Sequence, residues 1–194
     1  MASHPLVTAA ANGCLPDWVV AEPGRVAHMT RVAHVLDSWA EELGLTEEER
    51  VRWRAAGYLH DALRDATPSS LRSLVPGGFA DVPDALLHGP AAAERLRTEG
   101  VADEELLAAV AFHTIGDASF GRLGRALYSA DFLEPGRTFL VEQRAELRVR
   151  APAELYEVTF EVARARIASL VDRKMELHPW TVAFWNTLVA ERHE

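Results

Sequence analysis

Apolar residues recur at helical spacing along most of this chain, and this pattern most constrains its fold. Between Arg25 and Leu43 they return every three or four residues, which places them on one face of a helix. Similar runs follow to the end of the chain, separated by glycine, proline and cap residues. No stretch of five or more residues alternates convincingly between apolar and polar side chains, as a half-buried strand does. The pattern predicts an all-α fold, a single helical bundle of roughly eight to ten helices.

Several helix starts can be placed from local signals. Thr46 with Glu49 forms a capping box, and Thr67-Pro68 and Asp103 have the residue types that begin helices. The pattern is weaker in residues 1–24, which we expect to form an N-terminal extension with at most a short helix. Leu15, Trp18 and Val19 fall at helical spacing there and are expected to cover the core. Residues 25–194 are expected to form the functional domain.

Composition and charge exclude several classes of protein. The chain has 194 residues, is 48% hydrophobic and carries a formal net charge of −9. This acidity argues against a nucleic-acid binder and makes a polyanionic substrate difficult unless cations are bound locally. The only cysteine, Cys14, rules out a disulfide framework and a thiolate metal cage. The start lacks the pattern of a signal peptide, and no apolar run approaches the about 20 residues of a membrane span. These features predict a cytoplasmic protein without a membrane partner.

His60 and Asp61 stand side by side at the end of an otherwise apolar helical run. A buried imidazole or carboxylate is costly unless something pairs with it, and a metal ion is the simplest partner. Four other histidines are set aside. His4 and His193 are expected to be solvated near the termini, His178 to cap the helix that begins at Pro179, and His34 to be a surface or half-buried residue. What remains is a set of polar residues at helix ends or on apolar helix edges: His28, His60, Asp61, His88, His113 and Asp131.

Each of these histidines, taken alone, would be read as a hydrogen-bonded core residue. Together with the two aspartates they point to a metal centre, and their number fits two ions better than one. Neutral imidazoles and carboxylates suit iron, manganese, zinc or another first-row metal. In this interpretation Asp61 is shared between the two ions. One ion takes His28, His60 and Asp131, and the other takes His88 and His113.

The order of these residues and the short motifs around them resemble those of the HD-domain metal-dependent phosphohydrolases. Three motifs are similar to those of the bacterial YqeK-type branch: Leu87-His88-Gly89-Pro90, His113-Thr114-Ile115-Gly116, and the run from Ala130 to Arg137. The likeness extends from about Arg25 to Arg137 and continues faintly to the end of the chain. It implies an all-helical enzyme with a di-iron centre that hydrolyses diadenosine tetraphosphate symmetrically to two ADP.

The chain departs from the branch at three places. Arg64 stands where the branch usually has lysine, three residues after the HD aspartate, and Arg differs from Lys in reach and geometry. Ile115 replaces the second threonine of a His-Thr-Thr-Gly word. The first 24 residues have no obvious counterpart. These departures bear on substrate preference more than on metal binding.

The expected mechanism is attack on a phosphorus by a hydroxide that bridges the two metals, with Asp61 as the shared carboxylate. Arg64 and Arg137 are expected to neutralise charge on the phosphate oxygens, and Gly89 and Thr114 to lie near the substrate. The expected partner is a small nucleotide, and a homodimer is left open. Two alternatives remain. One is an HD phosphohydrolase that acts on another nucleotide or phosphate ester. The other is a catalytically silent HD signalling module, which the complete ligand set disfavours.

Overall fold

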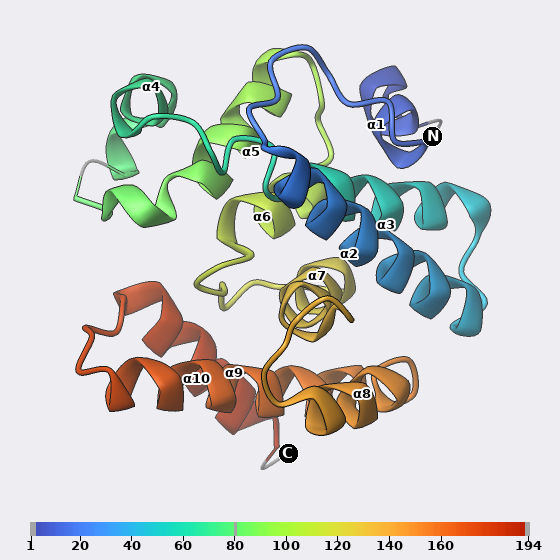
Figure 1. Cartoon of the computed structure of the whole chain (residues 1–194), viewed down its shortest axis with the longest axis vertical. Helices are drawn as coiled ribbons and strands as arrows, with labels where there is room; N and C mark the ends of the chain where they lie inside the picture. The colour runs from blue at the N-terminus through green and yellow to red at the C-terminus, as the bar shows by residue number, and fades with distance from the viewer. Residues whose placement is uncertain (1–2, 80, 193–194) are drawn as a thin grey trace.

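The protein is helical throughout the part of the chain described by this computed structural model, residues 3–79 and 81–192 (Figure 1). Within these residues there are ten α-helices, two short 3-10 helices and no strand, so the prediction of an all-α fold is confirmed. In chain order the elements are α1 Pro5–Ala11, α2 Pro23–Glu42, α3 Glu47–Leu59, α4 Pro68–Leu74, η1 Gly77–Phe79, η2 Asp84–Leu86, α5 His88–Thr98, α6 Glu104–Phe112, α7 Arg122–Leu133, α8 Val141–Arg150, α9 Leu155–Asp172 and α10 Pro179–Glu191.

The predicted helix starts are confirmed by their hydrogen bonds. The Thr46 hydroxyl accepts from the backbone N–H of Glu49 at 3.3 Å, and the Glu49 carboxylate accepts from the N–H of Thr46 at 3.0 Å. This reciprocal pair begins α3. Thr67 caps α4 and Asp103 caps α6 in the same way, through their side-chain oxygens. Each cap satisfies a backbone donor that the first turn of a helix otherwise leaves unpaired.

The N-terminal segment differs from the prediction. Its helix is α1, which begins well before Leu15, while residues 15–19 are not helical. Trp18 and Val19 nevertheless pack against the core. His4, expected to be solvated, is partly buried, and its Nδ1 accepts from the N–H of Leu6 at 3.2 Å and caps α1. A ring nitrogen can replace the usual hydroxyl or carboxylate in this position. His193 lies outside the described residues.

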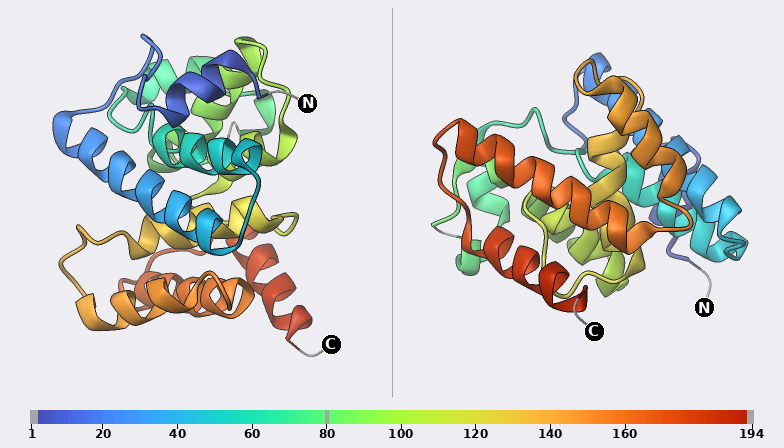
Figure 2. Two further views of the ribbon diagram at one scale, coloured as in Figure 1. Left: turned by 90° about the vertical axis from the view of Figure 1, so that its right-hand side faces the viewer. Right: turned by 90° about the horizontal axis from the view of Figure 1, so that it is seen from below.

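Helix α7 is the central element of the fold. Ten of its twelve residues are buried, and it packs against α2, α3 and α6 on one side and against α8 and α9 on the other. Figure 1 and the left view of Figure 2 show it between an upper group of helices, α1 to α6, and a lower group, α8 to α10. Side chains on α7 therefore face both groups from the interior of the molecule.

Two helices approach each other closely because α3 carries a glycine at the crossing. A Cβ on Gly57 would lie 2.4 Å from the Cα of Ala33 on α2, a separation that packed atoms do not adopt. The crossing brings His28 on α2 next to His60 at the end of α3. Among the described residues, no helix is long and apolar enough to span a membrane.

Candidate metal centre

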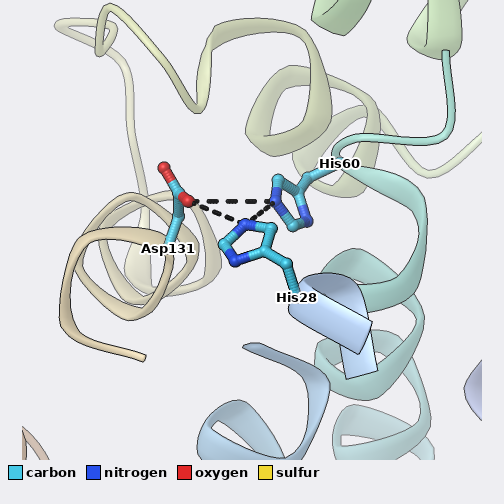
Figure 3. Close-up of side chains that lie close together, drawn as sticks. All are labelled: His28, His60 and Asp131. Atoms are coloured by element: carbon cyan, nitrogen blue, oxygen red, sulfur yellow. Dashed lines mark hydrogen bonds and ion pairs between the residues drawn. The ribbon is translucent and has the colours of Figure 1, made fainter. Parts of the chain in front are cut away.

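The six residues singled out in the sequence come together in the interior. They lie on or at the end of α2, α3, α5, α6 and α7, and all of them are buried. Figure 3 shows three of them, His28, His60 and Asp131, pointing toward one another from separate elements. Because buried polar groups need partners, their convergence calls for something that satisfies all of them.

His28, His60 and Asp131 form one group. The Nε2 atom of His28 lies 3.1 Å from Oδ1 of Asp131 and 3.3 Å from Nε2 of His60, and the third separation, from His60 to Asp131, is 4.0 Å. When ligand atoms each lie about 2.0–2.2 Å from one first-row ion, the distances between the ligand atoms are similar to the three separations found here. The three residues could therefore hold an ion.

Asp61 faces two pairs of histidines with its two oxygens. Its Oδ2 lies 3.7 Å from Nε2 of His28 and 3.6 Å from Nε2 of His60. Its Oδ1 lies 3.2 Å from Nε2 of His88 and 3.4 Å from Nε2 of His113. A carboxylate in this position can be shared between two ions. The arrangement agrees with the bridging role expected from the sequence, which stays a prediction.

The hydrogen bonds of the rings leave the converging nitrogens as electron-pair donors. Nδ1 of His60 lies 2.8 Å from the carbonyl oxygen of Gly57, and Nδ1 of His28 lies 3.2 Å from a carboxylate oxygen of Glu134. These oxygens accept, so Nδ1 carries the proton in both rings and Nε2 carries the lone pair. The two Nε2 lone pairs then face each other across 3.3 Å, which is repulsive unless a cation lies between them. The donor set therefore fits a metal ion.

Ionisation of the site suits the same chemistry. Burial lowers the pKa of His60 to about 4 and also lowers the pKa of His88, which keeps both imidazoles neutral at pH 7 as ligands must be. Burial alone would raise the pKa of Asp61, but the surrounding histidines, His60 first, hold it well below its usual range. The pKa of Asp131 is likewise held down, against burial, by the His28 hydrogen bond and the charge of Arg166.

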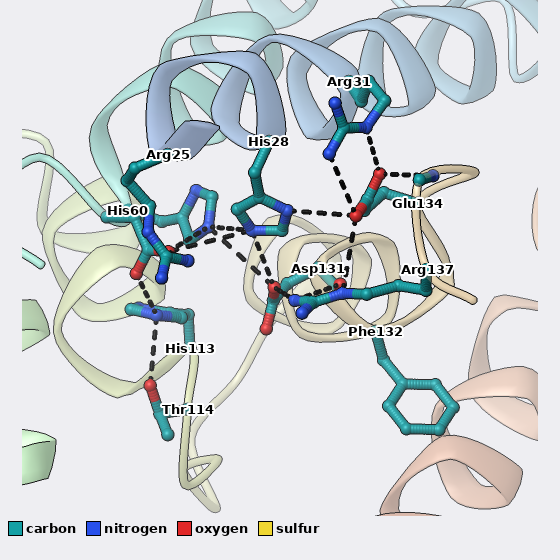
Figure 4. A network of polar contacts seen from close by, with 12 residues as sticks. Arg25, His28, Arg31, His60, His113, Thr114, Asp131, Phe132, Glu134 and Arg137 are labelled. Atoms are coloured by element: carbon teal, nitrogen blue, oxygen red, sulfur yellow. Dashed lines mark hydrogen bonds and ion pairs between the residues drawn. The ribbon is translucent and has the colours of Figure 1, made fainter. Parts of the chain in front are cut away.

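Sequence reasoning missed a shell of charged residues around these ligands (Figure 4). Arg25 donates to Oδ2 of Asp61 at 2.7 Å, and Arg166 donates to Oδ2 of Asp131 at 2.8 Å. Glu134 accepts from His28 and also from Nε of Arg31, at 2.5 Å. Such contacts orient a ligand and set its tautomer.

For two of these residues a sequence signal existed. Arg25 precedes His28 by three positions, which places the two on one face of α2, and Glu134 follows Asp131 by the same spacing. No comparable signal marks Arg166, which lies on α9 and reaches Asp131 only through the tertiary fold.

The residues predicted to contact substrate are placed in different ways. Arg137 donates to Oδ1 of Asp131 at 2.9 Å and is half-buried. The hydroxyl of Thr114 lies 3.1 Å from Nε2 of His113. Arg64 is exposed, and its charge contributes to the lowered pKa of His88.

Gly89 packs against the backbone of α6. A Cβ there would lie 2.7 Å from the carbonyl oxygen of Ala111, so the approach of α5 to α6 accounts for this glycine. That packing, rather than room for a ligand, explains the absence of a side chain. A contact between Gly89 and substrate stays a prediction.

Comparison with known proteins decides the family. A family model described as the HD domain matches residues 25–181. This chain belongs to the HD domain family. The expected relationship to HD-domain hydrolases is thereby confirmed.

Curated relatives carry one name, symmetrical bis(5'-nucleosyl)-tetraphosphatase. The protein of that name from Halalkalibacterium halodurans is 28% identical over 143 residues, covering 71% of this chain and 75% of the relative. The one from Bacillus subtilis is 25% identical over 172 residues, covering 86% and 90%. A crystal structure from Clostridium acetobutylicum, described as a predicted HD superfamily hydrolase involved in NAD metabolism, is similar in fold. Its TM-score is 0.75 at 24% identity, covering 98% of this chain and 99% of that one.

Proposed function

We propose that this HD-domain hydrolase cleaves dinucleoside polyphosphates, and that it cuts diadenosine tetraphosphate symmetrically into two ADP. The observation that supports this most is the position of Asp61, whose two oxygens face two separate pairs of histidines. A pair of ions is suited to phosphoryl hydrolysis, because it can stabilise both the attacking and the leaving oxygen. The names of the curated relatives support the choice of substrate.

In this proposal His28, His60 and Asp131 would hold one ion, His88 and His113 would hold the second, and Asp61 would contribute to both. Both ions are first-row metals, with iron expected and manganese or zinc as alternatives. When bound, they supply positive charge at the phosphate and lower the pKa of a water molecule toward neutrality.

The protein's own residues position these groups and bind the substrate. Arg25 and Arg166 each hold one ligand carboxylate through a charged hydrogen bond, which fixes its direction and offsets its charge. Glu134 keeps the proton of His28 on Nδ1 and so leaves Nε2 free to bind. Arg137 is half-buried and Arg64 is exposed, and both have N–H groups that can donate to phosphate oxygens. This local excess of arginine allows an acidic protein to accept a polyanion.

The test is product analysis after incubation of the metal-loaded protein with diadenosine tetraphosphate. ADP as the sole nucleotide product is expected. AMP with ATP would contradict symmetrical cleavage. Turnover of mononucleotides or simple phosphate esters, with none of the dinucleotide, would favour the alternative HD phosphohydrolase. A protein that binds metal but cleaves none of these would favour the silent signalling module.

A further inference from the structure

Three arginines gather where α7 ends and the lower helices begin. Arg137 follows α7, Arg144 lies on α8 and Arg166 lies on α9. Arg137 and Arg166 both donate to the Asp131 carboxylate, at 2.9 and 2.8 Å. Only one of the three, Arg144, has no ion pair among the described residues. The cluster therefore holds more positive than negative charge.

Arg144 is buried in an unusual way. Its side chain is 2% exposed, and it donates one N–H, from Nη1, to the carbonyl oxygen of Phe132. Its Nε and Nη2 atoms have no hydrogen-bond partner in the part of the chain that the structure describes. Burial, together with the charges of Arg137 and Arg166, lowers the pKa of Arg144 to about 10. A buried cation with unused donors is costly unless an anion compensates it.

Two aromatic rings cover the faces of this guanidinium, and one of them is exposed. Arg144 is stacked between the rings of Phe132 and Phe139, with its central carbon 3.9 and 3.7 Å from their centroids. Phe132 belongs to α7, and its ring points away from the histidines (Figure 4). Phe139 instead lies in the connection before α8 and is 53% exposed. Rotation of Phe139 would uncover one face of the guanidinium.

We infer that Arg144 forms, with Arg137, a phosphate-binding subsite on the Asp131 side of the metal centre, with Phe139 as its cover. The ligand class is a phosphate group of a polyphosphate chain, distal to the one that reacts. A guanidinium fork matches phosphate oxygens in pairs, and the flanking rings hold its plane in place. This inference deepens the proposed function and rests on it for the identity of the substrate.

The decisive experiment measures binding rather than turnover. Inorganic tripolyphosphate is titrated calorimetrically into the metal-loaded full-length protein, for the wild type and for Arg144→Gln, at low and at physiological salt. The variant is expected to bind roughly tenfold more weakly, or about 1.4 kcal/mol, with a shallower salt dependence. Binding within about twofold of the wild type would overturn the subsite.

Arg148→Gln is the matched control. Arg148 lies one turn further along α8 and also donates to a carbonyl oxygen at the end of α7, that of Leu133, at 2.7 Å. If Arg144 served only to satisfy such carbonyls, both variants would affect binding alike, and that result would also overturn the subsite. The expected result is that Arg148→Gln binds tripolyphosphate within about twofold of the wild type.

Phe139→Ala keeps the inference testable should Arg144→Gln not fold. Because Phe139 is half-exposed, its truncation should preserve the circular dichroism spectrum. Removal of the cover should raise the association rate constant of tripolyphosphate, measured by stopped flow, by roughly threefold or more. An unchanged rate constant would overturn the cover. None of these readouts requires cleavage, so asymmetric products from diadenosine tetraphosphate would refute the proposed function and leave the subsite standing.

Discussion

Asp61 is the residue at which the two halves of the candidate centre meet. Because its two oxygens face different pairs of histidines, Asp61→Ala should impair both halves together. Metal content measured by mass spectrometry should fall from about two ions per chain to well below one, and hydrolysis should be lost. Asp65→Ala, at an exposed position four residues on, should retain both. A fully loaded and active Asp61→Ala protein would refute the shared carboxylate.

Glu134 acts on the centre through His28. The replacement Glu134→Gln removes the charge that fixes the tautomer of the ring and also weakens the contact with Arg31. We expect metal affinity to fall about 10- to 100-fold, measured by competition with a chromogenic chelator. The matched variant Glu142→Gln, at an exposed position in the first turn of α8, should leave the affinity unchanged. Equal affinities for wild type and Glu134→Gln would show that the contact does not tune His28.

For single residues, the sequence identifies polar side chains that stand in otherwise apolar helical runs. A histidine or aspartate in an apolar helical run is visible without a structure, and all six such residues converge in the fold. Arg25, Glu134 and Arg166 are different, because an arginine or glutamate is ordinary on a helix surface. Their hydrogen-bond partners are 36, 106 and 35 positions away, so spacing can place Arg25 and Glu134 beside a candidate ligand, but the partner of each residue is visible only in the tertiary fold.

At the scale of elements, the crossing of α2 and α3 depends on Gly57. Gly57→Ala would place a methyl group 2.4 Å from Ala33 and force the two helices apart. We expect a loss of about 1–3 kcal/mol in the free energy of unfolding, measured with urea, and weaker metal binding because His28 and His60 separate. Gly24→Ala is the matched control, since nothing lies within 4 Å of the added methyl group. A fully stable Gly57→Ala protein would show that the crossing is adaptable.

The elements themselves follow from local chemistry where the signals are short-range. The starts of α3, α4 and α6 are predictable because a cap residue and the N–H that it satisfies lie within three positions. The start of α1 follows the same rule as the predicted start of α10, because in both a histidine caps a helix that begins with proline, and sequence reasoning missed the pattern only at His4-Pro5. The segment around Trp18 is held by burial rather than by helical hydrogen bonds, and its apolar spacing resembles a helix only in the sequence.

At the scale of the whole molecule, buried neutral histidines make stability depend on pH. The pKa of His60 is about 4 in the folded protein and 6.5 in an unperturbed histidine. Between these pH values His60 is protonated in the unfolded chain but not in the folded chain. The free energy of unfolding therefore falls as pH falls from about 6.5 toward 4. For metal-free protein, His60 alone should lower the free energy of unfolding by about 2 kcal/mol between pH 7.5 and pH 5.

Urea unfolding in the presence of a chelator measures this dependence, and Asp61 and Asp131 act in the same direction at lower pH. A free energy that is flat between pH 7.5 and pH 5 would contradict a neutral, buried His60.

Charge is unevenly distributed over the molecule. The net charge of −9 predicts poor tolerance of polyanions, yet several arginines lie around the carboxylates of Asp61 and Asp131. Composition reports the sum of the charges, and only the fold shows where they gather. The division of the chain after residue 24, the cytoplasmic location and a possible homodimer stay predictions.

The candidate ligands come from five helices that lie far apart along the chain, α2, α3, α5, α6 and α7. Ions that bind all five would act as a cross-link, and binding to the folded chain alone raises its stability by mass action. Scarcity of metal in a cell would then abolish the activity of the protein. It would also shorten the lifetime of the protein, because locally opened chains are substrates for proteases. The abundance of this enzyme is therefore expected to follow the metal supply of the cell.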